Sequence, residues 1–122
     1  MLHVLIHDAR AELDEGRRVA TLLSGLGFAV ELFSDGPKFL EAAVTRPPEL
    51  VVYALGPVLE ADLGVLRLLR RAQPEVGLIV LTAEASLTTR TAVQPLRPTF
   101  YSVGPLDPAE LTEVVRAAVR RR

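Results

Sequence analysis

His7 and Asp8 form the first pair of side chains in this 122-residue sequence that could do chemistry. An imidazole can bind a metal ion or accept a phosphoryl group, and a carboxylate can help to hold a metal ion. His3 lies four residues before His7, which puts both on the same side of an extended strand but about 13 Å apart at ~3.3 Å per residue. That distance is too long for a shared metal ion. We therefore interpret His7 as a hydrogen-bonded histidine at the rim of a site.

The remaining candidates for chemistry are isolated. Glu60 and Asp62 could accept a phosphoryl group, but we interpret them as solvated or capping residues, with Asp62 as the N-cap of a helix. The sequence contains no cysteine, no GxGxxG, P-loop, GxSxG or HExxH motif, and no glycine in residues 8–11 that would let the backbone approach a phosphate. We therefore expect no enzymatic activity, no cofactor and no metal ion.

Short apolar runs alternate with segments of helical period along the whole chain. We expect strands over residues 4–6, 28–33, 50–55, 76–82 and 99–103. Helices are expected over residues 11–25, from residue 37 to the break at Pro47-Pro48, and over residues 62–72, 86–93 and 108–122. The fourth helix should be short or distorted, because it is rich in threonine and is followed by Pro95.

Five strand–helix units with short connections predict an α/β fold. The expected architecture is a doubly wound, five-stranded parallel sheet in the flavodoxin-like order 2-1-3-4-5, with helices on both faces. We expect residues 1–122 to form a single domain. Ligands of such folds bind at the carboxyl ends of the strands, which here end near Asp8, Ala54, Thr82 and Gly104.

The composition excludes several classes of partner. The net charge is −1, so the chain has no overall basic field for nucleic acid or anionic lipid. No apolar run approaches the length of a membrane span, and the chain opens without a basic leader. The absence of cysteine fits a reducing compartment. We therefore expect a cytoplasmic globular protein that binds neither nucleic acid nor membrane, with the arginines near its carboxyl terminus solvated.

A set of motifs in a fixed order carries a resemblance to a known family. They are Leu26-Gly27-Phe28, Ser34-Asp35-Gly36, Pro48-Glu49-Leu50-Val51, Ile79-Val80-Leu81-Thr82-Ala83, Tyr101, Gly104-Pro105-Leu106-Asp107-Pro108 and Glu110-Leu111. Over essentially the whole chain, the sequence resembles the receiver domain of bacterial two-component response regulators.

The resemblance also implies that the reaction centre of the family is missing. The aspartate that accepts the phosphoryl group in the family corresponds to Ala54. The acidic pair that holds Mg²⁺ becomes His7-Asp8 or Asp8-Ala9, depending on the register, and the lysine before the last loop becomes Gly104. We expect Asp8 to be the only nearby carboxylate, which leaves a nearly neutral pocket with a weak or absent Mg²⁺ site.

Two further features match the family. Thr82 and Tyr101 correspond to a pair that rearranges on phosphorylation, although both also suit a sheet without any switch. The Gly104-Pro105 bond corresponds to a cis peptide bond in the family, so we expect it to be cis.

These observations predict a pseudo-receiver that acts by phosphorylation-independent protein–protein interaction. By resemblance, its partner would be a histidine kinase or another regulator, bound on the face of the fourth helix, fifth strand and fifth helix, and two copies could also pair there. The candidate contacts are Thr88, Arg90, Tyr101, Thr112, Arg116 and Arg120. One alternative is a response regulator receiver that is phosphorylated by a histidine kinase at a non-standard acid, and another is a small-molecule-binding flavodoxin-like module.

Overall fold

Five parallel strands form one sheet in the order β2-β1-β3-β4-β5 in the computed structural model, which describes residues 2–10 and 14–120. The strands are β1 (His3–Asp8), β2 (Ala29–Phe33), β3 (Leu50–Ala54), β4 (Gly77–Thr82) and β5 (Phe100–Val103). The helices are α1 (Glu15–Gly25), α2 (Gly36–Thr45), α3 (Leu59–Ala72), α4 (Leu87–Val93), a 3-10 turn η1 (Gln94–Leu96) and α5 (Pro108–Arg120). The predicted fold class and strand order are confirmed.

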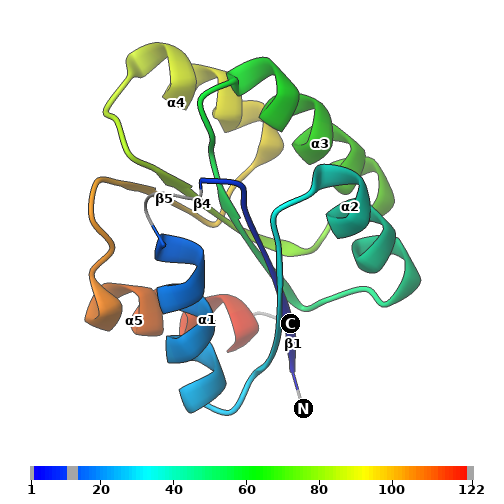
Figure 1. Cartoon of the computed structure of the whole chain (residues 1–122), viewed down its shortest axis with the longest axis vertical. Coiled ribbons are helices and arrows are strands. Elements are labelled where there is room, and N and C mark those ends of the chain that lie inside the picture. Colours follow the sequence, from blue (N-terminus) through cyan, green and yellow to red (C-terminus); the bar gives the residue numbers. More distant parts are fainter. Residues whose placement is uncertain (1, 11–13, 121–122) are drawn as a thin grey trace.

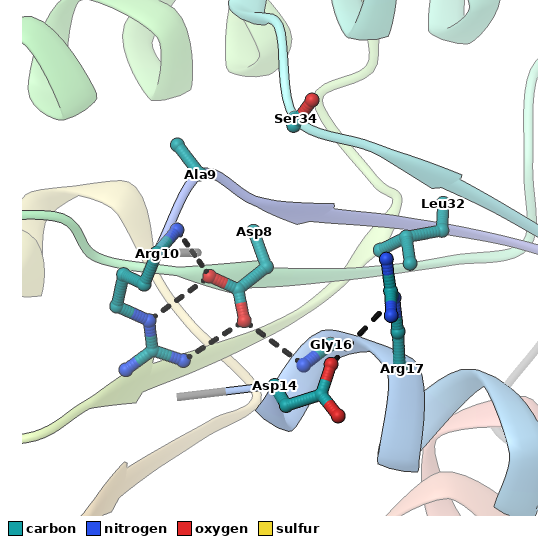
Figure 2. A pocket seen from close by; sticks show the side chains of 8 residues that line it. All are labelled: Asp8, Ala9, Arg10, Asp14, Gly16, Arg17, Leu32 and Ser34. Atoms are coloured by element: carbon teal, nitrogen blue, oxygen red, sulfur yellow. Dashed lines mark hydrogen bonds and ion pairs between the residues drawn. The ribbon is translucent and has the colours of Figure 1, made fainter. Parts of the chain in front are cut away.

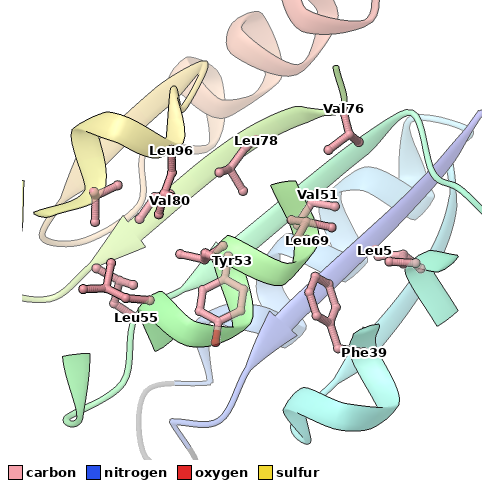
Figure 3. Close-up of a cluster of buried hydrophobic side chains, with 14 residues drawn as sticks. Leu5, Phe39, Val51, Tyr53, Leu55, Leu69, Val76, Leu78, Val80 and Leu96 are labelled. Atoms are coloured by element: carbon pink, nitrogen blue, oxygen red, sulfur yellow. The ribbon is translucent and has the colours of Figure 1, made fainter. Parts of the chain in front are cut away.

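Helices cover both faces of the sheet. Helices α1 and α5 lie on one face, and α2, α3 and α4 lie on the other (Figure 1). Side chains alternate along β1, so Leu5 packs into the core beneath α2 and α3 (Figure 3), while Val4 and Ile6 pack toward α1 and α5. Every residue of β3 is buried, as its continuous apolar sequence predicts for a central strand covered on both sides.

The helix boundaries differ from the expectations in informative places. Helix α1 begins at Glu15, after Asp14 in a left-handed conformation, and not near residue 11. Residues 11–13 of the helix expected over residues 11–25, and the last two residues of the predicted final helix, lie outside the described residues. The fourth helix is short and continues into η1, as expected from its threonines and Pro95.

The assignment of Asp62 as an N-cap is wrong. Helix α3 begins three residues earlier, at Leu59, so Asp62 lies within its first turn. Its carboxylate is buried and accepts hydrogen bonds from the Tyr53 hydroxyl (2.8 Å) and from the Gly56 amide (2.8 Å). Asp62 therefore ties α3 to β3 and to the loop between them.

A single arginine fixes the loop between α4 and β5. The Arg70 guanidinium, near the end of α3, donates to the carbonyl oxygens of Leu96 (2.7 Å), Val76 (2.7 Å) and Arg97 (3.0 Å). It also contacts the carbonyl oxygens of Gln73 and Pro74. These bonds join the end of α3, the start of β4 and the turn η1. They satisfy carbonyl groups that no helix or strand uses.

No helix in the described parts of the chain is long and apolar enough to cross a membrane.

Candidate functional site

Strand register brings most of the predicted site residues to the carboxyl edge of the sheet. Asp8 at the end of β1 is paired in register with Ala54 at the end of β3, and Ala54 with Leu81 of β4. Thr82 follows Leu81, and its carbonyl oxygen accepts a hydrogen bond from the Gly104 amide at 2.9 Å. The structure therefore places Asp8 beside Ala54, whereas His7 pairs with Tyr53.

The Asp8 carboxylate is held on all sides by donors. Its Oδ1 accepts from the Arg10 backbone amide (2.8 Å) and from Arg10 Nε (3.0 Å). Its Oδ2 accepts from Arg10 Nη2 (3.3 Å) and from the Gly16 amide (2.9 Å) at the start of α1 (Figure 2). The side chain is only 4% exposed. A buried carboxylate is stable only when it is paired and hydrogen-bonded in this way.

Glu15 is a second carboxylate in the same cluster, so the expectation that Asp8 stands alone is wrong. Arg10 Nη2 donates to Glu15 Oε1 at 2.9 Å, and Glu15 Oε2 accepts from the Leu106 amide at 3.2 Å. Burial alone would lower the pKa of Arg10, but the hydrogen bonds and charges of Asp8 and Glu15 outweigh it and raise the pKa. The guanidinium therefore stays positively charged between two acids.

Gly16 allows this close approach. A Cβ on this residue would lie 2.7 Å from the Asp8 Cβ and 3.1 Å from Leu32 Cδ1. The missing side chain lets the first turn of α1 bring its backbone N–H to the Asp8 carboxylate. A surface pocket of about 390 Å³ lies beside these residues, with Ser34 and Arg17 also in its lining (Figure 2).

The residues at this edge do not fit a Mg²⁺ ion. Mg²⁺ requires oxygen ligands in a near-octahedral arrangement. The side chains of the neighbours Ala9 and Ala54 are only methyl groups, and both oxygens of Asp8 are already occupied by N–H donors. Within residues 2–10 and 14–120, no group of three or more His, Asp or Glu side chains could hold a metal ion.

His7 is not the hydrogen-bonded rim residue that the sequence predicts. It is 4% exposed and points to the opposite face of β1, where its ring stacks on Tyr53 (centroids 4.4 Å apart, 10° between planes). Its Nδ1 is buried without a hydrogen-bond partner. Burial lowers the pKa of His7, although Asp62, Asp8 and Asp35 act in the other direction. Successive side chains of a strand point to opposite faces, so His7 lies on the face opposite Asp8 and not at the rim beside it.

The expectation of a cis bond between Gly104 and Pro105 is also wrong. No peptide bond in the described parts of the chain is cis. Gly104 adopts a φ of +82°, so the chain turns after β5 through a backbone conformation that favours glycine. Thr82 is buried, and its hydroxyl lies 3.4 Å from the Glu84 carbonyl oxygen.

The predicted interaction residues lie on three elements around the β5 edge. Thr88 and Arg90 belong to α4, Tyr101 to β5, and Thr112, Arg116 and Arg120 to α5. The Arg90 guanidinium carbon lies 5.1 Å from the centroid of the Tyr101 ring, and the Tyr101 hydroxyl is buried without a hydrogen-bond partner. Burial raises the pKa of Tyr101, opposed by the charge of Arg90. The Thr112 hydroxyl donates to the Pro108 carbonyl oxygen.

Arg10 and Glu15 are the site residues that sequence reasoning missed. In the sequence, Arg10 belongs to the glycine-free stretch of residues 8–11, and Glu15 lies within the helix expected over residues 11–25. The sequence offers only a weak indication of this ion pair, since an arginine and a glutamate five positions apart form no specific motif. The pairing depends on where α1 begins, which hydrophobic periodicity does not fix.

The fold is that of CheY-like receiver domains. The structure matches a CheY-like receiver domain protein from Methanospirillum hungatei with a TM-score of 0.85 at 18% identity, covering 99% of this chain and 95% of that one. It matches the chemotaxis protein CheY4 of Vibrio cholerae with a TM-score of 0.82 at 19% identity, covering 97% of this chain and 98% of that one. No protein-family model matches the chain.

Curated relatives identify the signalling class. The chain is 36% identical over 117 residues to the response regulator MprA of Mycobacterium leprae, which covers 95% of this chain and 50% of that protein. It is 33% identical over 116 residues to the transcriptional regulatory protein PrrA of Mycobacterium tuberculosis, which covers 94% of this chain and 47% of that protein. The chain thus spans about half the length of these relatives. It is a receiver domain homologous to two-component response regulators.

Proposed function

We propose that this chain is a pseudo-receiver, which acts by protein–protein interaction without phosphoryl transfer. The observation that carries the proposal is Ala54, the residue in register with Asp8 at the carboxyl end of the central strand. Its methyl group has no lone pair that could attack phosphorus. Gly104, at the position of the lysine in the family, likewise has no side chain to contact a phosphoryl group.

The contacts of the other acids argue against phosphorylation at a non-standard position. Asp8 accepts four hydrogen bonds, and both oxygens of Asp62 accept bonds from Tyr53 and Gly56. The four bonds to Asp8 occupy all of its lone pairs, and the two bonds to Asp62 hold its carboxylate against Tyr53 and Gly56, so both groups are poor nucleophiles. Glu60 is exposed in the first turn of α3.

The α4–β5–α5 face, which carries the six candidate contacts named above, is the proposed partner surface. It combines exposed arginines on two helices with the half-buried ring of Tyr101 between them. A groove of about 520 Å³ runs between α4, η1 and β5, and Arg90, Arg97 and Tyr101 line it. Aromatic and arginine side chains are the residue types that most often dominate protein interfaces. The proposed partner is a histidine kinase or another regulator.

Acetyl phosphate tests the proposal directly. The protein is incubated with acetyl phosphate and MgCl₂, and its intact mass is then measured. We expect no added phosphate, because Ala54 cannot accept it. A receiver that retains the aspartate at the end of its third strand, treated in parallel, serves as the positive control. An added phosphate mass that disappears in Asp8→Asn, Glu60→Gln or Asp62→Asn would defeat the proposal and establish the alternative acceptor.

A further inference from the structure

We propose that Arg10 is a built-in counter-ion, which takes the place of an exchangeable divalent cation between Asp8 and Glu15 and holds the loop from β5 to α5 in one arrangement. This inference rests on the proposed function, because it explains how the domain keeps a fixed shape without metal ion or phosphate. It concerns the same edge of the sheet, but depends on residues other than Ala54.

The first support is the geometry of the guanidinium. Arg10 Nη2 lies 2.9 Å from Glu15 Oε1 and 3.3 Å from Asp8 Oδ2, so one nitrogen bridges the two acids. Arg10 Nε adds a bond of 3.0 Å to Asp8 Oδ1 (Figure 2). A charged fork that contacts a carboxylate through two nitrogens is the strongest arrangement that arginine makes with a carboxylate.

The second support is burial. The side chains of Arg10, Asp8 and Glu15 are 8%, 4% and 9% exposed. Two carboxylates that are this close and this deeply buried repel each other, and a cation between them offsets that repulsion. In this chain the cation is covalently attached, so the site needs no ion from solution.

The third support is the connection from this cluster to the partner face. Glu15 Oε2 accepts the Leu106 amide at 3.2 Å, and Leu106 lies in the loop that leads from β5 into α5. A continuous path of hydrogen bonds therefore runs from Asp8 through Arg10 and Glu15 to Leu106. Arg10 thereby fixes the position of the segment that enters α5.

The test compares Arg10→Met with the wild type and with Arg17→Met. Met keeps much of the length and apolar stem of arginine but removes the charge. Arg17 lines the same pocket, yet its side chain is 78% exposed and forms only a long contact (3.6 Å) with Asp14, so Arg17→Met is the matched control. Hydrogen exchange of the Leu106 amide, followed by NMR, and thermal unfolding with and without MgCl₂ are the measurements.

We expect Arg10→Met to unfold at lower temperature and to exchange its Leu106 amide about tenfold faster, the factor for the loss of one hydrogen bond to a charged group. MgCl₂ should raise its melting temperature and slow this exchange, because the two freed carboxylates then attract a cation. The wild type and Arg17→Met should respond to MgCl₂ no more than to an equal ionic strength of NaCl. Unchanged exchange at Leu106, or no recovery with MgCl₂, would overturn the proposal.

A measurement on the wild type keeps the proposal testable if Arg10→Met does not fold. MnCl₂ is added to the labelled wild-type protein, and paramagnetic broadening of the Gly16 amide signal is recorded. Gly16 donates directly to Asp8, so an ion entering this site would broaden its signal first. We expect broadening no greater than at exposed acids such as Glu60, and selective broadening of Gly16 would show that Arg10 does not close the site.

The two proposals fail in different ways. Uptake of phosphate by the wild type would defeat the pseudo-receiver function whatever Arg10 does. Failure of the exchange, MgCl₂ or MnCl₂ tests would defeat the counter-ion and leave the argument from Ala54 intact.

Discussion

Burial of the His7 imidazole makes the stability of the fold depend on pH. The ring packs against Tyr53 and Phe39, with centroid distances of 4.4 Å and 5.4 Å. Burial lowers its pKa below the ordinary value of 6.5, although three acids, Asp62, Asp8 and Asp35, oppose the shift. Below that ordinary value the unfolded chain binds a proton that the folded chain does not. The free energy of unfolding therefore decreases as the pH is lowered, until the lowered pKa of the folded chain is reached.

The variant His7→Phe tests this linkage. Phenylalanine can stack on Tyr53 but cannot be protonated. Below about pH 6.5 and down to the lowered pKa of the folded state, the wild type should lose up to about 1.4 kcal/mol more per pH unit than the variant, and above pH 6.5 the two should run parallel. Urea unfolding at a series of pH values measures the difference. Identical slopes for both proteins would show that His7 does not carry the pH dependence.

The sequence predicts single residues at this site better than their pairings. Asp8 and Ala54 were identified from their places at the ends of apolar runs, and the strand register confirms that they are neighbours. The ion pairs of Arg10 depend on the conformation of a loop, and no periodic pattern reports that conformation. For His7 the position itself was wrong. It was expected at the rim of a site, whereas the alternation of side chains along the strand places it in a core.

Among the elements, the short α4–η1 segment depends most on a single contact from outside. Arg70 donates to the carbonyl oxygens of Leu96 and Arg97, at the end of η1, and of Val76, at the entry to β4. Arg97 has a φ of +55°, a strained conformation for a side chain of this type, and its carbonyl is held by the Arg70 bond. Removal of the guanidinium therefore leaves several carbonyl groups without a protein donor.

We expect Arg70→Ala to lower the free energy of unfolding by roughly 2–3 kcal/mol, the range for loss of hydrogen bonds from a charged group. Arg70→Lys should recover only part of this loss, because an ammonium group cannot reach carbonyls on three segments at once. Arg67→Ala, an exposed position on the same helix, is the control. Denaturant unfolding measures all three, and full recovery in Arg70→Lys would contradict the role of the planar fork.

Hydrophobic period predicts which elements form, and tertiary contacts decide where they begin. The five strands follow from short apolar runs in the sequence, and the five helices follow from apolar residues that recur with helical period. Helix α3 begins earlier than expected because Asp62 is used inside the helix, bonded to Tyr53, and not at its cap. Helix α1 begins later than its helical pattern, at the point where Gly16 can meet Asp8.

At the scale of the whole molecule, β5 is an edge strand flanked by α4 on one side of the sheet and α5 on the other (Figure 1). This edge exposes Leu87, at 80%, and Val103, at 40%, beside the arginines of α4 and α5. Apolar side chains surrounded by a polar or charged rim are typical of protein–protein interfaces. A two-fold axis at this edge would bring the same surface of two copies together.

We expect the protein to self-associate through this face, so that its weight-average sedimentation coefficient rises with concentration. Arg116→Glu should shift the equilibrium toward the monomer, because it reverses a charge at the centre of the exposed side of α5. Arg67→Glu, exposed on α3, should leave it unchanged. Concentration-independent sedimentation of the wild type would exclude the homodimer, and an equal response of both variants would place the contact elsewhere.

The covalent attachment of Arg10 has a consequence for how such a domain can carry information. A metal ion or a phosphoryl group reports a signal because its occupancy changes with time. The Arg10 side chain is present in every molecule from the moment of synthesis, and chelators or phosphatases cannot remove it. Under the proposed function, the output of this domain would therefore follow the number of copies present and not the occupancy of this site.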